Sequence, residues 1–497
     1  GLALGPNKLE LIGRERFYGY IACTRARERL VLTCAAQDSE AHAKNPSPLF
    51  SLIEQLFPAL PLEPCAPEKD WFESEHQCEL IAPLVQAQNA GEKNNLTALA
   101  EMPLFASLQK PLAHFASISK EEILSPQKAE ELYGTTLKTS VSLLEQYAAC
   151  PFRFFVSAGL RAQERRVFEV DVREKGSFQH AVLAKFHEQL RDENKRWRDL
   201  SPDQARKRIG SIGAELKLSF RDGLFGSDAQ SDFSAQSMVE SLQNFIETII
   251  EWMQQYNFNP HLVELGFGAG EKSLPAWEIN LDERHKLALR GIIDRVDLFH
   301  MPETNEALAV IMDYKSSAKQ LDPVLLANGL QLQLLAYLAF LRHLPDPENL
   351  FGAKRLIPAG VFFVNLRGNY SGGKTRNEVL NNLKDSRQTA FQHTGRFDFT
   401  TLAQLDNRNE KTGTQFNYRL KADGQPHGAS REILATENFL KLLDDVETHL
   451  AKMGEEIFSG MVKIDPYQKG KMRACHQCDY AQICRIDPWT HAYRVLK

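Results

Sequence analysis

The sequence predicts an α/β protein, because runs with the character of buried strands alternate with long segments of helical periodicity. The strands are expected in LALRGIIDRVDLF at 287–299, ALAVIMDYK at 307–315 and AGVFFVNL at 359–366. The helices are expected within 176–260, 324–342 and 433–460. The length of 497 residues favours two or three domains over one.

The composition is that of an ordinary globular protein, with 43% hydrophobic and 25% charged residues. The net charge of -5 gives no overall basic signature, although nucleic-acid binding depends on local patches rather than on the total charge. No segment has the pattern of a signal peptide or a membrane span, so a cytoplasmic protein without membrane contact is expected. Since the chain begins at Gly1, we expect a fragment of a longer protein.

Three regions are expected along the chain. Residues 1–60 contain a helix followed by a short apolar strand at 17–34, and a proline-bounded amphipathic helix at 46–60. Residues 61–138 contain seven prolines and predict a linker. The last unit, 139–497, starts near Thr139 with Ser140 or Ser142 as the cap of a helix.

Two acids and a lysine stand on the first two of these strands. Alternate side chains of a strand share a face, so Asp313 and Lys315 project together, whereas Asp294 projects from an apolar face where an unpaired acid is costly. If the two strands are neighbours, Asp294 and Asp313 meet, and their repulsion favours a divalent cation. Oxygen ligands with open water positions suit Mg²⁺ or Mn²⁺.

Such a site hydrolyses phosphodiesters, since the metal activates water and Lys315 polarises the phosphate or orients the water. The alternative for a bare Asp-x-Lys is an ordinary ion pair on a surface strand. Asp297, three residues from Asp294 and on the opposite face, is interpreted as structural.

The order GIIDRVD, apolar strand, DYK and Gln333-x-x-x-Tyr337 resembles the RecB-like branch of the PD-(D/E)XK nucleases. This resemblance implies a restriction-endonuclease-like core, a mixed sheet flanked by helices, with helical insertions. It also implies that Gln333 and Tyr337, which share a helical face, position DNA near the metal. His180 in GSFQHAVLAKF resembles the histidine of the family's metal site, beside Asp294 and Asp313. A lone histidine on an amphipathic helix is otherwise a packing or surface residue.

Four cysteines form a second candidate site. Cys475-x-x-Cys478-x5-Cys484 supplies three ligands, and Cys150 is the obvious fourth. Four thiolates suit zinc or an iron–sulfur cluster, and reduced buried thiols are the alternative. The one-plus-three arrangement resembles the iron–sulfur staple of AddB-type nuclease domains, which implies a [4Fe-4S] cluster that ties the ends of the domain together without redox catalysis.

The segment YIACTRARERLVLT resembles the last conserved motif of superfamily 1 helicases. Thr24, Arg25 and Arg27 match the motif, whereas Cys23 departs from it, and a basic helix start is the alternative. The resemblance implies that residues 1–60 end a RecA-like domain in which Arg25 would sense the nucleotide. The rest of the motor would lie outside this chain, so no ATPase activity is expected from it.

A literal phosphate-loop pattern, GxxxxGK[ST], spans 368–375. It continues into the polar NEVLNNLKDS rather than into an apolar helix, so a glycine-rich surface loop is favoured over ATP binding by Lys374.

The resemblance therefore implies a metal-dependent DNA exonuclease. It would be one subunit of a helicase–nuclease that prepares double-strand breaks for recombination, acting on a single-stranded DNA end with an AddA-type partner subunit. Two alternatives stay open. One is a free-standing RecB-like exonuclease of the CRISPR-associated kind, against which the helicase segment argues. The other is a nuclease-inactive DNA-binding subunit, against which the complete set of catalytic residues argues.

Overall fold

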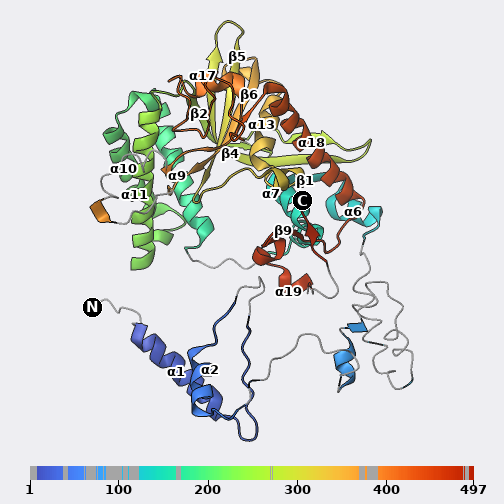
Figure 1. Ribbon diagram of the computed structural model, residues 1–497. Coiled ribbons are helices and arrows are strands. Elements are labelled where there is room, and N and C mark those ends of the chain that lie inside the picture. The colour runs from blue at the N-terminus through green and yellow to red at the C-terminus, as the bar shows by residue number, and fades with distance from the viewer. Residues whose placement is uncertain are drawn as a thin grey trace. The chain divides into compact units, whose positions relative to one another are not determined.

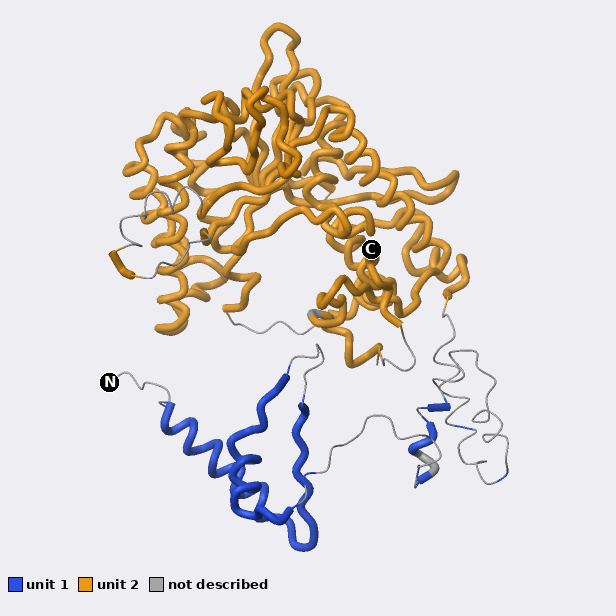
Figure 2. Tube along the Cα trace, in the orientation of Figure 1, with its two compact units in different colours: residues 1–117 blue, residues 118–497 orange. Residues whose placement is uncertain are grey.

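The computed structural model divides the chain into two compact units, residues 1–117 and 118–497 (Figure 2). It describes residues 8–36, 43–60, 123–163, 170–268, 273–368, 375–377, 390–484 and 492–497, together with Gly270, Ile486 and a few residues between 62 and 110. Within these residues, no helix combines the length and the apolarity that a membrane crossing requires.

The first unit contains two helices, α1 (Lys8–Thr24) and α2 (Pro48–Leu56). Helix α2 is the expected amphipathic helix, and its cap is the Ser47 hydroxyl, which accepts a hydrogen bond from the Phe50 amide. The strand expected after α1 is wrong, because the described residues 25–36 form none. Leu30 and Val31 are exposed there, and an apolar run without a partner strand has no ladder to join.

The second unit is built on a mixed sheet, as expected. Its strands are β1 (Thr136–Ser140), β2 (Asn259–Phe267), β3 (Trp277–Asn280), β4 (Lys286–Met301), β5 (Glu306–Lys315), β6 (Arg355–Asn365), β7 (Thr394–Asp398) and β8 (Ile433–Leu434). The order is β1-β4-β5-β6-β7-β8, and β2 and β3 also pair with β4. The β1/β4, β5/β6 and β7/β8 pairs are parallel and the others antiparallel. Because β4 is so long, it joins both halves of the sheet.

Helices cover both faces of this sheet (Figure 1). One face packs against α7 (Val141–Ala149), α13 (Gln333–Arg342) and α18 (Thr436–Phe458). The other packs against α9 (Val172–Asp192), α10 (Pro202–Ser219) and α11 (Ala229–Trp252). Strand β5 is buried on both sides: Ala309 and Ile311 join the first core, and Val310 and Met312 the second.

The region 324–342, which we expected to be helical, contains two helices joined by a loop. Helix α12 (Pro323–Ala327) ends, and α13 begins at Gln333. Between them Gly329 and Gln331 have left-handed φ angles of 76° and 59°, which a continuing helix cannot contain. The break decides where α13 starts, and so where Gln333 lies.

The remaining elements are short. They are α6 (Pro126–Tyr133), α8 (Pro151–Phe154), a π-helix (Phe155–Gly159), α14 (Glu348–Phe351), α17 (Leu402–Leu405), α19 (Ala481–Cys484) and the small sheet β10-β9-β11 (Met472–Arg473, Tyr467–Lys469, Arg494–Val495). Single 3₁₀ turns occupy Gln77–Leu80, Trp197–Asp199, Leu224–Gly226, Phe399–Thr401 and Ala474–Gln477. Helix α6 and the first residues of β1, which precede the expected start at Thr139, belong to the second unit.

Candidate active site

Strands β4 and β5 bring the two predicted acids together. The strands are antiparallel with Arg295 opposite Met312, so the next positions along the ladder are Asp294 and Asp313. Both carboxylates are largely buried, with 11% and 8% of their side chains exposed. Asp294 Oδ2 accepts a hydrogen bond of 2.7 Å from the amide of Tyr314, which fixes the carboxylate across the two strands.

His180 reaches Asp294 from helix α9. Its Nδ1 lies 3.5 Å from Asp294 Oδ1 and 3.5 Å from Glu264 Oε1, and its Nε2 lies 3.3 Å from the Tyr314 carbonyl oxygen. Burial lowers the pKa of His180, but hydrogen bonds with Asp294 and Glu264 outweigh burial and raise the pKa to about 10. The ligand atoms of His180, Glu264 and Asp294 all lie within 4.8 Å of one another, which is close enough to hold one metal ion.

Glu264, on β2, is the residue that the sequence analysis missed. Its φ is 48°, a left-handed conformation inside a strand. The residues on either side of it pair with Arg295 and Ile293 of β4, which leaves Glu264 beside Asp294. Such a backbone costs a non-glycine residue about 1–2 kcal/mol. An acid within the apolar HLVELGF, just before GIIDRVD, is the signal that could have found it.

Asp313 stands beside this group with Lys315. The Lys315 ammonium lies 2.6 Å from Asp313 Oδ2, as the shared face of β5 predicts. Burial raises the pKa of Asp313, Lys315 lowers it, and the neighbouring Asp294 raises it again. The balance is a raised pKa, mainly because burial disfavours the charged carboxylate. The structure thus places His180, Glu264 and Asp294 in one group, with the Asp313–Lys315 pair next to it.

Helix α13 adds the predicted glutamine and tyrosine. The Gln333 side-chain amide donates to the Tyr337 hydroxyl at 3.1 Å. Burial raises the pKa of Tyr337 to about 12, Gln333 opposes this, and the acids of β4 and β5 reinforce it, so the phenol lies in their electrostatic field. A Cβ on Gly291 of β4 would come within 2.7 Å of the Tyr337 hydroxyl, so the absence of a side chain at Gly291 leaves room for the tyrosine. The backbone amide of Gln333 donates a hydrogen bond of 2.8 Å to the carboxylate of Glu145 on α7.

A buried ion pair supports the site from the other face of the sheet. The Arg295 guanidinium contacts Asp297 at 2.8 Å and donates to the Tyr314 hydroxyl at 3.1 Å, and both charged side chains are fully buried. The Tyr256 hydroxyl also donates to Asp297, at 2.9 Å. Asp297 is structural, as the alternation of the strand predicts. The network holds Tyr314, which separates the acid and the lysine on β5.

Four thiols converge near the ends of the second unit. One small cavity is lined by Cys150, Cys475, Cys478 and Cys484. All four are free, and Cys150 is buried between α7 and α8. Burial raises the pKa of Cys150 and Cys475, and neighbouring thiols raise it further. Because thiolates so placed repel one another, this donor set fits a soft metal or an iron–sulfur cluster.

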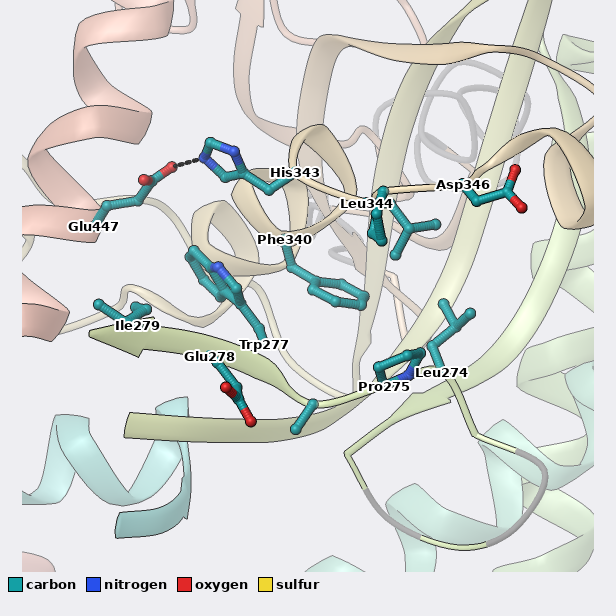
Figure 3. Close-up of a pocket in the computed structure, with 12 residues that line it drawn as sticks. Leu274, Pro275, Trp277, Glu278, Ile279, Phe340, His343, Leu344, Asp346 and Glu447 are labelled. Atoms are coloured by element: carbon teal, nitrogen blue, oxygen red, sulfur yellow. Dashed lines mark hydrogen bonds and ion pairs between the residues drawn. The ribbon is translucent and has the colours of Figure 1, made fainter. Parts of the chain in front are cut away.

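A separate pocket of about 580 Å³ lies between β3, α13 and α18 (Figure 3). Trp277 stacks on His343, and His343 Nε2 lies 2.8 Å from Glu447. None of the residues that line this pocket belongs to the acid–lysine group. The pocket is therefore not part of the candidate active site.

The phosphate-loop pattern predicted at 368–375 lies largely outside the described residues. Lys374 of the phosphate-loop pattern lies outside them, and only the ends of that pattern, Gly368 and Thr375, lie within them. In the first unit, Thr24 ends α1, where its hydroxyl donates to the Tyr20 carbonyl at 2.8 Å, and the matching arginines that follow are exposed.

The comparisons with known proteins agree with this geometry. Residues 138–485 match the family model of the PD-(D/E)XK nuclease superfamily, a stretch that contains all the acids, the lysine, the histidine and the four clustered cysteines. Curated relatives, each named as the B-type subunit of an ATP-dependent helicase/deoxyribonuclease, are 28% identical in Desulforamulus reducens and 30% identical in Moorella thermoacetica. Each of these two matches covers 98% of this chain and 43% of the relative. The relative of the same name from Pelotomaculum thermopropionicum is 28% identical over the whole chain and 44% of its own length.

The chain thus spans less than half the length of these relatives. Its own match to the family model covers most of its residues and encloses every member of the site built by β2, β4, β5, α9 and α13. The chain belongs to the PD-(D/E)XK nuclease superfamily.

Proposed function

We propose that this chain is the nuclease part of a helicase–nuclease and cuts DNA with a divalent metal ion. The observation that carries the proposal is the meeting of His180, Glu264 and Asp294 beside the Asp313–Lys315 pair. The names of the relatives, which combine a helicase with a deoxyribonuclease, support DNA as the substrate.

The residues present fit Mg²⁺ or Mn²⁺. His180, Asp294 and Asp313 would hold the ion. Glu264 would be a further ligand, since its carboxylate lies within 4.8 Å of the ligand atoms of His180 and Asp294. The raised pKa of Asp313 reflects burial and the charge of Asp294, and a divalent cation would relieve both acids. When bound, the metal supplies an activated water and stabilises charge on the phosphate.

The chain's own side chains would position the DNA. Lys315 points its ammonium to the acids and would contact the scissile phosphate, where a fixed cation stabilises developing negative charge. Gln333 and Tyr337, joined by their hydrogen bond, would orient the strand from α13. Tyr314 directs its carbonyl to His180 and is held from behind by Arg295, so its place in the site is fixed before DNA arrives.

We also propose that Cys150, Cys475, Cys478 and Cys484 hold a [4Fe-4S] cluster. It would join the start and the end of the nuclease unit, where the Tyr480 hydroxyl already donates to the Ala162 carbonyl. Iron and acid-labile sulfide in the purified chain, lost in Cys478→Ser, would support the cluster. Zinc in place of iron would overturn it in favour of a zinc site.

The relatives are named as one subunit of a larger enzyme, which favours a second protein beside this chain, and we take that partner to be of the AddA type. The complex would process double-strand breaks for recombination from a single-stranded end. The segment TRARE in the first unit favours this over a free-standing nuclease. The six cysteines of the described residues that are free of disulfides suit a reducing compartment such as the cytoplasm.

The test is cleavage of end-labelled single-stranded DNA with Mg²⁺ or Mn²⁺ by the chain and by Asp313→Ala and Lys315→Ala. Loss in both variants with an unchanged circular dichroism spectrum is expected. Lys441 and Asp445 form an exposed ion pair of the same residue types on α18, so Lys441→Ala and Asp445→Ala are matched controls that should cut normally. Circular single-stranded DNA should survive if the activity is exonucleolytic. Unchanged cleavage by both site variants would contradict the assignment.

A further inference from the structure

A second lysine lies next to the site in the loop that follows β5. Lys319 comes four residues after Lys315 and is half-buried. Its ammonium lies 4.8 Å from the ring centroid of Phe363, a buried residue of β6. An ammonium over an aromatic face is attracted electrostatically to the ring, which restricts the positions that the lysine side chain can take.

The loop itself is fixed by strand β7 and the break before α13. The Thr394 hydroxyl donates to the Lys319 carbonyl, and Arg396 donates to the Leu321 carbonyl at 2.9 Å. The amide of Asp322 donates to the Gln331 side chain at 2.9 Å. Lys319 is therefore carried on anchored backbone, so little entropy is lost when it binds a ligand.

Among the described residues, Lys319 has no close counterion. Lys315 has Asp313 at 2.6 Å, whereas no carboxylate of the described residues lies within ion-pair distance of the Lys319 ammonium. Burial lowers the pKa of Lys319, and repulsion from Lys315 lowers it further, whereas the charges of Glu145 and Asp313 raise it by less. Two half-buried lysines that repel each other are stabilised by an anion that contacts both.

We propose that Lys319 is a DNA-binding residue of the nuclease, taking a backbone phosphate next to the one that Lys315 contacts. The inference deepens the proposed function, on which it rests, by adding a second phosphate position on the strand. A lysine binds phosphate as a point charge without base preference, so the contact would position the strand regardless of its sequence.

The alternative is that Lys319 has only a structural role, packing on Phe363. A packing role would change stability but not the dependence of DNA binding on salt. A phosphate contact changes that dependence, because each neutralised phosphate of single-stranded DNA adds about 0.7 to the slope of log K against log salt.

The experiment measures the anisotropy of a labelled oligothymidylate over a salt series, in Asp313→Asn protein so that nothing is cut. Lys319→Gln and Lys319→Met are compared with Lys319→Arg. Methionine keeps the apolar stem over Phe363 without the charge, so it separates packing from charge if glutamine fails to fold. Lys441→Gln on α18 is the control for a general loss of positive charge.

The expected result is a slope smaller by about 0.7 and an affinity about three- to tenfold weaker for Gln and Met, with Arg and the control near the parent. Unchanged slope in Met would overturn the proposal. Because binding is measured without cleavage, a change in slope supports a phosphate contact by Lys319 even if the parent chain does not cut DNA. Loss of cleavage in Asp313→Ala with normal binding tests the metal site alone. In cutting protein, Lys319→Met should raise KM far more than it lowers kcat.

Discussion

A single backbone angle decides whether Glu264 belongs to the site. Had this residue the φ of an ordinary strand, it would pair with β4 like its neighbours, and its side chain would follow the alternation of β2. The left-handed φ of 48° instead puts the carboxylate 3.5 Å from His180. Strain of this kind persists when the residue's function outweighs its effect on stability.

Replacing Glu264 by glycine should therefore separate stability from activity. Glu264→Gly removes the strain, so we expect the free energy of unfolding to rise by about 1 kcal/mol. The same change removes the proposed metal ligand, so we expect cleavage to fall at least tenfold. Urea unfolding and the cleavage assay measure the two effects.

Asp222 provides the control, since its φ of 57° is also left-handed but it lies in a turn far along the chain from the acids. Asp222→Gly should leave cleavage unchanged. A Glu264→Gly protein that cuts at the parent rate would remove Glu264 from the site.

At the scale of single residues, the sequence predicted those site residues whose positions follow from the regular spacing of side chains along a strand. Asp294, Asp313 and Lys315 follow from the alternation of two strands, and these strands are neighbours in the structure. Glu264 could not be predicted, because a strand pattern assumes regular φ angles. Lys319 could not either, since its place depends on hydrogen bonds from a strand some 75 residues later.

Among the elements, β7 approaches β6 so closely that one position has no room for a side chain. A Cβ on Gly395 would lie 1.8 Å from the Val361 carbonyl oxygen and 2.9 Å from Phe362 Cα. Both atoms are backbone, which cannot rotate away. Strand β7 also carries Thr394 and Arg396, which anchor the loop of Lys319, so this close pairing reaches the site.

Gly395→Ala should therefore destabilise the second unit by about 1–3 kcal/mol or more, because β7 must move away from β6. Gly428→Ala is the matched control, since a Cβ there meets nothing within 4 Å and the φ is not left-handed. Urea unfolding of both variants checks this, and equal stability of the two would contradict the close approach.

Helix α13 begins without a side-chain cap of its own, because its N-cap residue is Leu332. Glu145, from α7, accepts the hydrogen bond of the Gln333 amide instead. The sequence could not predict this cap, since periodicity carries no signal for a cap that comes from another helix.

Glu145→Ala should cost about 1.5–3 kcal/mol, the usual contribution of a hydrogen bond to a charged group, and should lower cleavage by shifting Gln333 and Tyr337. Glu145→Gln keeps an acceptor oxygen and should recover most of both losses. Thermal unfolding and cleavage are the measurements, and an alanine variant as stable as the glutamine variant would argue against the cap.

Over the whole molecule, the two cores on either side of the sheet differ in their buried titratable groups. The core under α9, α10 and α11 encloses His187 and His393, which are 6% and 0% exposed. Burial lowers the pKa of His187 to about 4 and that of His393 to about 3. Both are thus neutral in the folded protein at the pH where the unfolded chain, with a histidine pKa of about 6.5, becomes protonated.

Stability should accordingly be lost as pH falls below about 6.5. Between the unfolded and the folded pKa the unfolded state binds more protons, so the free energy of unfolding rises with pH by about 1.4 kcal/mol per unit for each histidine. His187→Asn, which keeps an acceptor for the Trp197 indole, should be about 2 kcal/mol less sensitive to a shift from pH 7 to pH 5. His427→Asn, in a surface loop, should show the parent's pH dependence.

The separation of the four cysteines along the chain has a consequence for folding during synthesis on the ribosome. Cys475 follows Cys150 by 325 positions, so at about 5–20 residues per second Cys150 is made on the order of 20–60 s before its partners. The helices and most of the sheet can fold in that interval, while Cys150 is still without the other three cysteines. The proposed iron–sulfur cluster would then be loaded after synthesis, and cells short of iron should accumulate full-length chains whose last residues stay open to proteases.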